Sequence, residues 1–252
     1  MFLEKWYGDV VDGNRVEIRY RANLKLGPVV IGYVGSITSC ARTRSVFVPG
    51  GVELPREVGG VLRWPASGSG ECDAPSWAGS HARAIALWQS GTHSLLWNPQ
   101  VLRGAVSGSG LSPDARGYVE KLTLDFGPWQ LGMKRLRWGR FCGERHSLVW
   151  IEWEGRHPRQ LVLLDGQARA LHEASRDGIR CAGASLDLAR RQCLIEEPMS
   201  EGALRGLRLP RQLAALQFLR GRETKWFAPA VLVIDGGDAH PGDAIFEEVV
   251  WP

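Results

Sequence analysis

A glutamate within an apolar strand pattern is the strongest indication of chemistry in this sequence. The segment from Gly117 to Arg140 reads GYVEKLTLDFGPWQLGMKRLRWGR. Side chains of an extended strand alternate between two faces, so Glu120 shares a face with Tyr118 and Leu122. A carboxyl group among apolar neighbours is either paired with a cation or has a raised pKa, and both conditions are commoner at working sites than on plain surfaces. Glu120 is therefore the first candidate catalytic residue, with Tyr118 beside it.

Arg140 is the third candidate, because it shares an apolar face with Leu136 and Trp138 in the motif RLRWGRF. If Arg140 pairs with Glu120, the carboxylate orients a substrate, whereas an unpaired Glu120 in an apolar pocket acts as a general acid. Each candidate also has a structural alternative. Glu120 and Arg140 would form an ion pair that joins two neighbouring strands, and Tyr118 would be a core residue with its hydroxyl bonded to backbone.

Eleven tryptophans supply candidate walls for an apolar pocket. Indole rings favour burial while the N–H needs a partner, so tryptophan suits cores and ligand pockets. Trp138, Trp150 and Trp153 crowd one short region, and we expect them to bind substrate together with Leu122 and Trp129. Trp150 and Trp153 point to opposite faces of their strand, so they do not line the same cavity.

The remaining acidic residues near apolar positions have simpler interpretations. Glu152 shares a face with Trp150 and is expected to be a paired carboxylate in the core. Glu223 and Lys225 are expected to face solvent at the start of a strand. Glu247 and Glu248 must point to opposite faces of theirs, and one of the two should be buried and paired.

Strand signals dominate the chain and predict an all-β fold. Arg15 to Ala22 alternates between apolar and charged residues, as a half-buried antiparallel strand does. Many short strands separated by glycine-rich turns indicate sandwiches or barrels. The other predicted strands cover 29–34, 45–48, 61–64, 84–88, 94–97, 118–126, 135–141, 147–153, 160–164, 167–172, 178–188, 193–197, 225–234 and 244–251.

Two polar stretches and one helical pattern complete this organisation. Residues 67–80 and 107–113 are rich in small and polar residues, which is typical of surface loops. We place the domain boundary in the second of them, giving domains at 1–112 and 113–252 with similar architecture. A short helix is expected from Pro210 to Arg220, where proline fits the first turn.

Composition excludes several classes of function. The net charge of +4 is spread along the chain without the clusters that nucleic-acid binding requires. Five cysteines without a CxxC pair are expected to be reduced thiols in a cytoplasmic protein, and no stretch is apolar enough for a signal peptide or membrane span. Scattered histidines predict no metal site, and the sequence has no motif for a cofactor.

Several motifs together resemble the lipocalin-like family that contains carotenoid 1,2-hydratase, also called hydroxyneurosporene synthase. They are the opening EKWYGDVV, GYVEKLTLDFGPW, LRWGRF followed by LVWIEW, and the closing ETKWF and FEEVVWP. The resemblance spans nearly the whole chain, and the tripeptide at Trp138, Gly139 and Arg140 is its most specific part. It implies two calycin-type antiparallel barrels packed together and a long, hydrophobic, conjugated ligand, since members include carotenoid hydratases and natural-product pericyclases.

The segment around Glu120 departs from the hydratase pattern. Carotenoid hydratases of this family carry a histidine and acidic residues there, whereas this chain has Glu120 and no histidine between Gly117 and Leu124. The departure favours a cofactor-independent cyclase that folds a polyketide or isoprenoid polyene for a pericyclic, Diels-Alder-like ring closure, because such a reaction needs no proton shuttle. A hydratase or proton-initiated cyclase that uses Glu120 as acid, and a non-catalytic polyene or lipid carrier, are the alternatives.

Overall fold

The computed structural model describes residues 1–39, 41–66, 74–79, 81–199 and 220–252. Its first ten strands form one antiparallel sheet of ten strands. They are β1 (Phe2–Asp12), β2 (Arg15–Leu26), β3 (Val29–Thr38), β4 (Ala41–Pro49), β5 (Arg56–Val58), β6 (Val61–Arg63), β7 (Ser76–Gly79), β8 (Ile85–Ser90), β9 (His93–Ser107) and β10 (Arg116–Leu124).

The next ten strands form a second ten-stranded sheet. They are β11 (Met133–Gly143), β12 (Ser147–Gly155), β13 (Arg159–Leu164), β14 (Gln167–Arg169), β15 (Leu171–Ala174), β16 (Gly178–Cys181), β17 (Ala184–Asp187), β18 (Gln192–Pro198), β19 (Arg222–Ile234) and β20 (Ala239–Val250). A single 3₁₀ turn, η1 (Pro128–Leu131), stands between the two sets. The predicted all-β fold of two lipocalin-like antiparallel barrels is confirmed.

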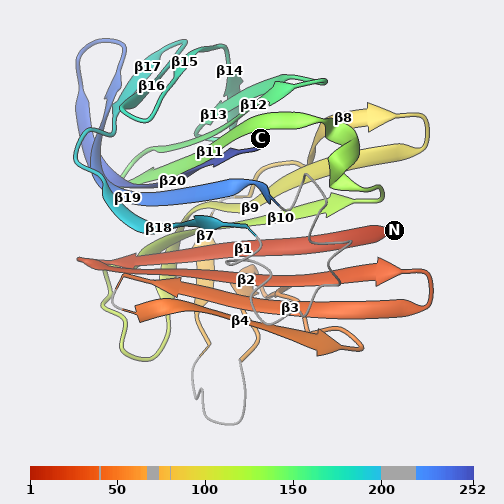
Figure 1. The fold of residues 1–252 in the computed structure, drawn as a ribbon. Helices are drawn as coiled ribbons and strands as arrows, with labels where there is room; N and C mark the ends of the chain where they lie inside the picture. The colour runs from red at the N-terminus through yellow and green to blue at the C-terminus, as the bar shows by residue number, and fades with distance from the viewer. Residues whose placement is uncertain (40, 67–73, 80, 200–219) are drawn as a thin grey trace. The chain divides into compact units, whose positions relative to one another are not determined.

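Both sheets have the same strand order. The first runs β4-β3-β2-β1-β10-β9-β7-β6-β5 with β8 on β9, and the second runs β14-β13-β12-β11-β20-β19-β17-β16-β15 with β18 on β19 (Figure 1). In each, the tenth strand returns to pair with the first. The polypeptide therefore contains the same ten-strand topology twice.

The described residues divide into two compact units, from Met1 to Gly127 and from Pro128 onward. The division falls after Gly127 and not after residue 112, because β10 pairs with β1 and β9 and so completes the first sheet. Tyr118 and Glu120 consequently belong to the first unit, although the sequence analysis assigned them to the second domain.

Each unit has its own apolar core on one face of its sheet. In the first unit, buried Trp6 and Val10 of β1 pack with Trp64 and Trp77. The core of the second unit contains Phe141, Leu148, Trp150, Val162, Trp226, Leu232 and Phe246 among its members. Five of the eleven tryptophans, Trp6, Trp64, Trp77, Trp150 and Trp226, belong to these two cores.

Two strands of the first unit, β1 and β7, were not predicted from the sequence. The strand β1 has six consecutive buried residues, from Trp6 to Val11, so it lacks the alternation by which half-buried strands are recognised. The strand β7 lies within the polar stretch that was expected to be a loop. The helix expected from Pro210 to Arg220 falls on residues outside the described part of the chain, except Arg220.

Candidate functional site

All four tyrosines of the chain lie on one face of the first sheet. Tyr7 on β1 is paired with Tyr20 on β2, and their rings meet edge to face at 5.5 Å. On its other side the Tyr7 ring lies 6.1 Å from that of Tyr118 on β10. Tyr33 on β3 extends over Gly35, the ladder partner of Tyr20. We call these four residues the tyrosine row.

Glu120 stands at one end of the tyrosine row and accepts two hydrogen bonds on the same oxygen. The Tyr118 hydroxyl donates to Oε2 at 2.8 Å, and the indole N–H of Trp97 donates to it at 2.5 Å. Trp97 and Tyr118 are buried, while Glu120 is only partly buried. The hydroxyl partner of Tyr118 is thus a carboxylate and not backbone.

Asp9 is a second carboxylate of the site, and sequence reasoning missed it. It is fully buried on β1, where Oδ2 accepts the Tyr7 hydroxyl at 3.0 Å and Oδ1 accepts the backbone N–H of Tyr118 at 3.2 Å. The site therefore contains two tyrosine–carboxylate pairs on adjacent strands, Tyr7 with Asp9 and Tyr118 with Glu120. A buried carboxylate needs such partners to offset its lost hydration.

The backbone ladder between β1 and β10 opens at Asp9. Regular pairing stops at Gly8 with Val119 and resumes at Val11 with Arg116. In the gap, the Asp9 side chain accepts a hydrogen bond from the Tyr118 backbone N–H. The Asp9 backbone carbonyl accepts one from the indole N–H of Trp77 at 2.9 Å. Side chains thus replace main-chain partners, an irregularity that is common beside functional sites because it re-aims nearby residues.

Glycine at position 117 is required by this opening. An added Cβ there would lie against the Asp9 carbonyl and 2.6 Å from the Trp77 indole nitrogen. Real side chains do not tolerate such distances, so only glycine lets Trp77 reach the backbone of β1. The pairing of β10 with β9 also has β-bulges beside this opening, between Gly117 and Glu120.

Arg140 and Trp138 lie in the second unit, on β11. Arg140 is fully buried, and its guanidinium donates to the backbone carbonyl of Asp243 at 2.8 Å. The strand β11 pairs with β12 and β20, whereas β10 pairs with β1 and β9, so Glu120 and Arg140 are not on neighbouring strands of one sheet. A direct role of Arg140 with Glu120 stays a prediction.

The other predicted binding residues are spread over several environments. Leu122 follows Glu120 on the same face of β10, opposite Trp97. Trp150 lies in the core of the second unit, and Trp153, buried on the other face of β12, donates its indole N–H to the carbonyl of His157. Trp129 in η1 is 57% exposed. The structure thus brings Tyr118, Glu120 and Leu122 together, and binding roles for the tryptophans stay predictions.

Lys225 contradicts the expectation that the charges at the start of β19 face solvent. Its side chain is fully buried, and its ammonium pairs with Glu223 at 3.0 Å and with Glu247 more closely still. Two flanking carboxylates offset the cost of burying a lysine, which explains how a charged residue is buried near the start of this strand.

Glu152 and Glu248 behave as the sequence predicted. Glu248 is buried and binds Arg137 at 3.2 Å and Arg176, while Glu152 accepts from Arg137 at 2.8 Å. Burial alone would lower the pKa of Arg137, but the hydrogen bond and charge of Glu152, with the charge of Glu248, raise it. This network is a structural ionic cluster of the second unit.

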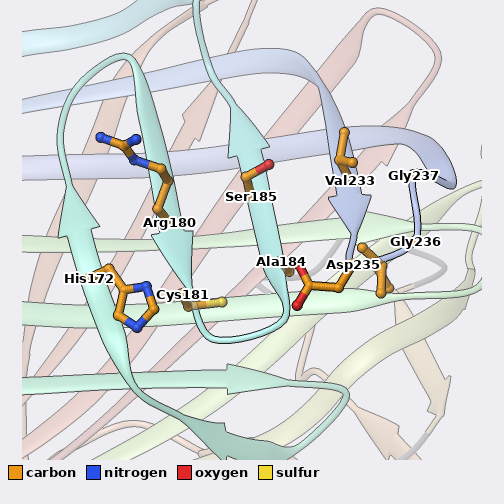
Figure 2. A pocket seen from close by; sticks show the side chains of 10 residues that line it. His172, Arg180, Cys181, Ala184, Ser185, Val233, Asp235, Gly236 and Gly237 are labelled. Atoms are coloured by element: carbon orange, nitrogen blue, oxygen red, sulfur yellow. The ribbon is translucent and has the colours of Figure 1, made fainter.

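A shallow groove on the second unit is a separate polar feature (Figure 2). It lies where the ends of β15 to β17 meet the end of β19, and none of the candidate residues from the sequence line it. Its Arg180 is engaged by Glu173, and burial raises the pKa of the Cys181 thiol, which disfavours the reactive thiolate. The lining residues are His172, Arg180, Cys181, Ala184, Ser185, Val233, Ile234, Asp235, Gly236 and Gly237.

In the part of the chain that the structure describes, no group of three or more His, Cys, Asp or Glu side chains is arranged to hold a metal ion. Within the same residues, no helix has the length and apolar character to cross a membrane.

Solved structures share this fold across almost the whole chain. Kievitone hydratase from Nectria haematococca is similar with a TM-score of 0.56 and 9% identity, over 99% of this chain and 88% of that chain. CghA with Sch210972 is similar with a TM-score of 0.54 and 11% identity, over the same shares. No protein-family profile and no curated protein matches the sequence. At these identities the likeness establishes the fold alone.

Proposed function

We propose that this chain is a cofactor-independent cyclase that holds a hydrophobic conjugated substrate against the tyrosine row of the first unit for ring closure. The single observation that carries the proposal is the convergence of the Tyr118 hydroxyl and the Trp97 indole on Glu120, with the Tyr7–Asp9 pair beside them. Partners that fix a carboxyl group so closely are typical of a preorganised site.

The aromatic rings of the row supply the positioning. Tyr20 and Tyr33 are partly exposed and offer ring surface to a flat conjugated chain, while the buried rings of Tyr7 and Tyr118 pack in succession beside Tyr20. Holding a flexible substrate near its reactive shape removes entropy from the barrier and contributes up to roughly 7 to 11 kcal/mol in the best intramolecular cases. Ring closure by this route needs no nucleophile.

The polar ends of the row supply the electrostatic contribution. A hydrogen bond from a neutral Glu120, which is only partly buried, to a carbonyl conjugated with the reacting alkene would polarise that alkene. One donor of this kind contributes about 3 kcal/mol to transition-state stabilisation, by analogy with an oxyanion hole. Asp9 keeps the Tyr118 backbone in place and so positions the donor.

A hydratase is the second candidate, and the Tyr118–Glu120 pair favours it specifically. Glu120, held by Tyr118 and only partly buried, would deliver a proton to an alkene, and its carboxylate would then accept one from water. Kievitone hydratase shares the fold, and the structure of CghA was determined with the small molecule Sch210972. Both names fit a protein that acts on or holds a small molecule.

The test incubates purified protein with candidate polyenes and follows the mass of the product. A cyclase gives an isomer of unchanged mass, a hydratase adds one water, and a carrier leaves the ligand unchanged. The variant E120Q keeps the size of the side chain but removes the acid, so it should abolish hydration and leave about a tenth or more of a shape-driven cyclisation. Unchanged ligand in every trial, despite measurable binding, would contradict both enzyme proposals and favour a carrier.

A further inference from the structure

We propose that the groove of the second unit is a binding site for a small organic amine in its ammonium form. The groove shares no residue with the tyrosine row, so this site is separate from the proposed cyclisation. Its volume of about 390 Å³ falls at the lower end of the range of ~300–1,000 Å³ that small-molecule pockets occupy. A space of this size holds a compact molecule.

Three strand connections meet at the groove. The backbone N–H of Ala182, in the turn from β16 to β17, donates to the carbonyl of Ala170, between β14 and β15, at 2.9 Å. The backbone N–H of Asp235, in the turn from β19 to β20, donates to the carbonyl of Gly183 at 3.0 Å. The main chain therefore holds the β19–β20 turn against the β16–β17 turn, and the walls of the groove are preorganised.

Asp235 supplies an unpaired negative charge to the groove. Its carboxyl group points from the β19–β20 turn toward Cys181 and Ala184 (Figure 2). Among the described residues, none makes a hydrogen bond or ion pair with that carboxyl group. Burial is the main cause that raises the pKa of the Cys181 thiol, and the negative charge of Asp235 adds to it. A cation that enters the groove can therefore pair with Asp235 without displacing another partner.

The arginines near the groove have partners of their own. The guanidinium of Arg180 donates to Glu173 at 2.9 Å and points away from Asp235 (Figure 2). The charge of Arg169 also acts on the Cys181 thiol, but Arg169 donates to Gln167 at 3.2 Å and lies outside the lining. Because Glu173 offsets the charge of Arg180, the negative charge of Asp235 dominates the groove. This favours a cationic ligand over an anionic one.

The remaining lining suits the two parts of an organic amine. Val233 is 37% exposed and Ile234 is partly exposed, so an apolar body that covers them removes their surface from water. His172 and Ser185 line the same space, and their side chains make no hydrogen bond with any described residue. An ammonium has three N–H donors, and the imidazole and hydroxyl groups add acceptors to the carboxylate of Asp235.

The experiment measures binding of 2-phenylethylamine, 2-phenylethanol and phenylacetate to the full chain at pH 7 by ligand-observed NMR. We expect the amine to bind about fivefold more tightly than the alcohol, which is the effect of a partly exposed ion pair, and phenylacetate to bind most weakly. D235N keeps the shape of the side chain and removes its charge, so amine and alcohol should then bind equally. The matched control D238N changes an aspartate of the same turn outside the lining and should preserve the preference. S185F places a ring in the groove and should weaken all three probes.

Equal affinities of the wild-type chain for amine and alcohol, tighter binding of phenylacetate, or no binding of any probe would overturn the proposal. A preference that survives in D235N, or that D238N removes to the same extent, would also overturn it, because the cation would then respond to general charge and not to the groove. Thermal unfolding shows whether each variant is folded, and S185F still locates the site if D235N is not. The cyclase proposal is judged separately, by the product masses and by E120Q.

Discussion

The two units have the same ten-strand topology and differ at the positions where chemistry is expected. A glycine follows the central aromatic residue of the first strand in each unit, Gly8 after Tyr7 and Gly139 after Trp138, and each glycine lies against an indole, that of Trp64 or Trp150. The difference begins one residue later. A comparison of the two units therefore separates the features that the shared topology requires from those that occur in one unit.

At that next position the first unit has Asp9 and the second has Arg140, both fully buried. The ladder around Asp9 is opened by side chains, while Arg140 pairs regularly with Ile245. On the last strand of each unit, Glu120 pairs with Tyr7 and its counterpart Glu247 pairs with Trp138. Glu120 accepts hydrogen bonds from Trp97 and Tyr118, whereas Glu247 binds Lys225. The first unit carries an irregular, neutral-donor site, and the second has a regular ladder with ionic pairs.

The largest loss of stability should follow from a substitution in the ion pairs around Lys225 of the second unit. E247Q removes one of the two carboxylates paired with the buried Lys225, and breaking a buried pair on one side costs about 3–5 kcal/mol of unfolding free energy. E120Q weakens the hydrogen bonds that Glu120 accepts from Trp97 and Tyr118, which costs about 1 kcal/mol. Urea denaturation of both variants checks this, and equal losses would contradict the contrast between the two glutamates.

The largest effect on activity should come from the opened ladder. D9N keeps the shape of Asp9 but weakens its bonds to Tyr7 and to the backbone of Tyr118, so kcat should fall by about 100-fold through loss of positioning. The matched control D243N alters an aspartate of the second unit and should leave kcat near the wild-type value. Full activity of D9N would show that the opening is only structural.

The two strand glycines should differ in their tolerance of a methyl group. In G139A the added Cβ would lie 2.6 Å from the Cβ of Phe246 and against the Trp150 ring, so we expect a loss of about 3 kcal/mol. In G8A the nearest atom is a ring carbon of Trp64 at 2.8 Å, and a small tilt of that ring limits the loss to about 1 kcal/mol. Melting temperatures of the two variants test this. A lower melting temperature for G8A than for G139A would contradict the packing described.

The smallest effect concerns the end of the central strand β1 and depends on pH. The Ser112 hydroxyl, and then its backbone N–H, lower the pKa of Asp12 at the end of β1. A carboxyl group with a lowered pKa stabilises the fold above its unfolded pKa of about 3.9, and this is lost as pH falls through the lower folded value. S112A should melt slightly below wild type at pH 7. The difference should shrink as the pH falls below the unfolded pKa of about 3.9; a gap that stays constant on acidification would exclude this cause.

The sequence predicted the fold class and one end of the site, because these depend on local pattern. Strand alternation placed Tyr118, Glu120 and Leu122 on one face, which the pairing of β10 confirms. The tyrosine content was the missed signal. Tyr7, Tyr20 and Tyr33 fall on three consecutive strands, and only their pairing register reveals that they share a face.

The rest depended on long-range pairing that one sequence does not encode locally. Asp9 lies in β1, which is buried on both faces. This strand therefore lacks the alternation of apolar and polar residues by which a strand is predicted from sequence. Lys225 was expected in solvent because its partner Glu247 lies on another strand. Trp97 was one of eleven tryptophans and had no distinguishing context until β9 was placed beside β10.

The central claim is that ligand binds on the tyrosine row, and fluorine NMR tests it most directly. Incorporation of 3-fluorotyrosine gives four resonances, one for each tyrosine, and Tyr-to-Phe variants assign them. On titration with trans-chalcone, the account predicts that the Tyr20 and Tyr33 signals shift with the same saturation curve that calorimetry gives. Saturable binding that leaves all four tyrosine signals unmoved would contradict it.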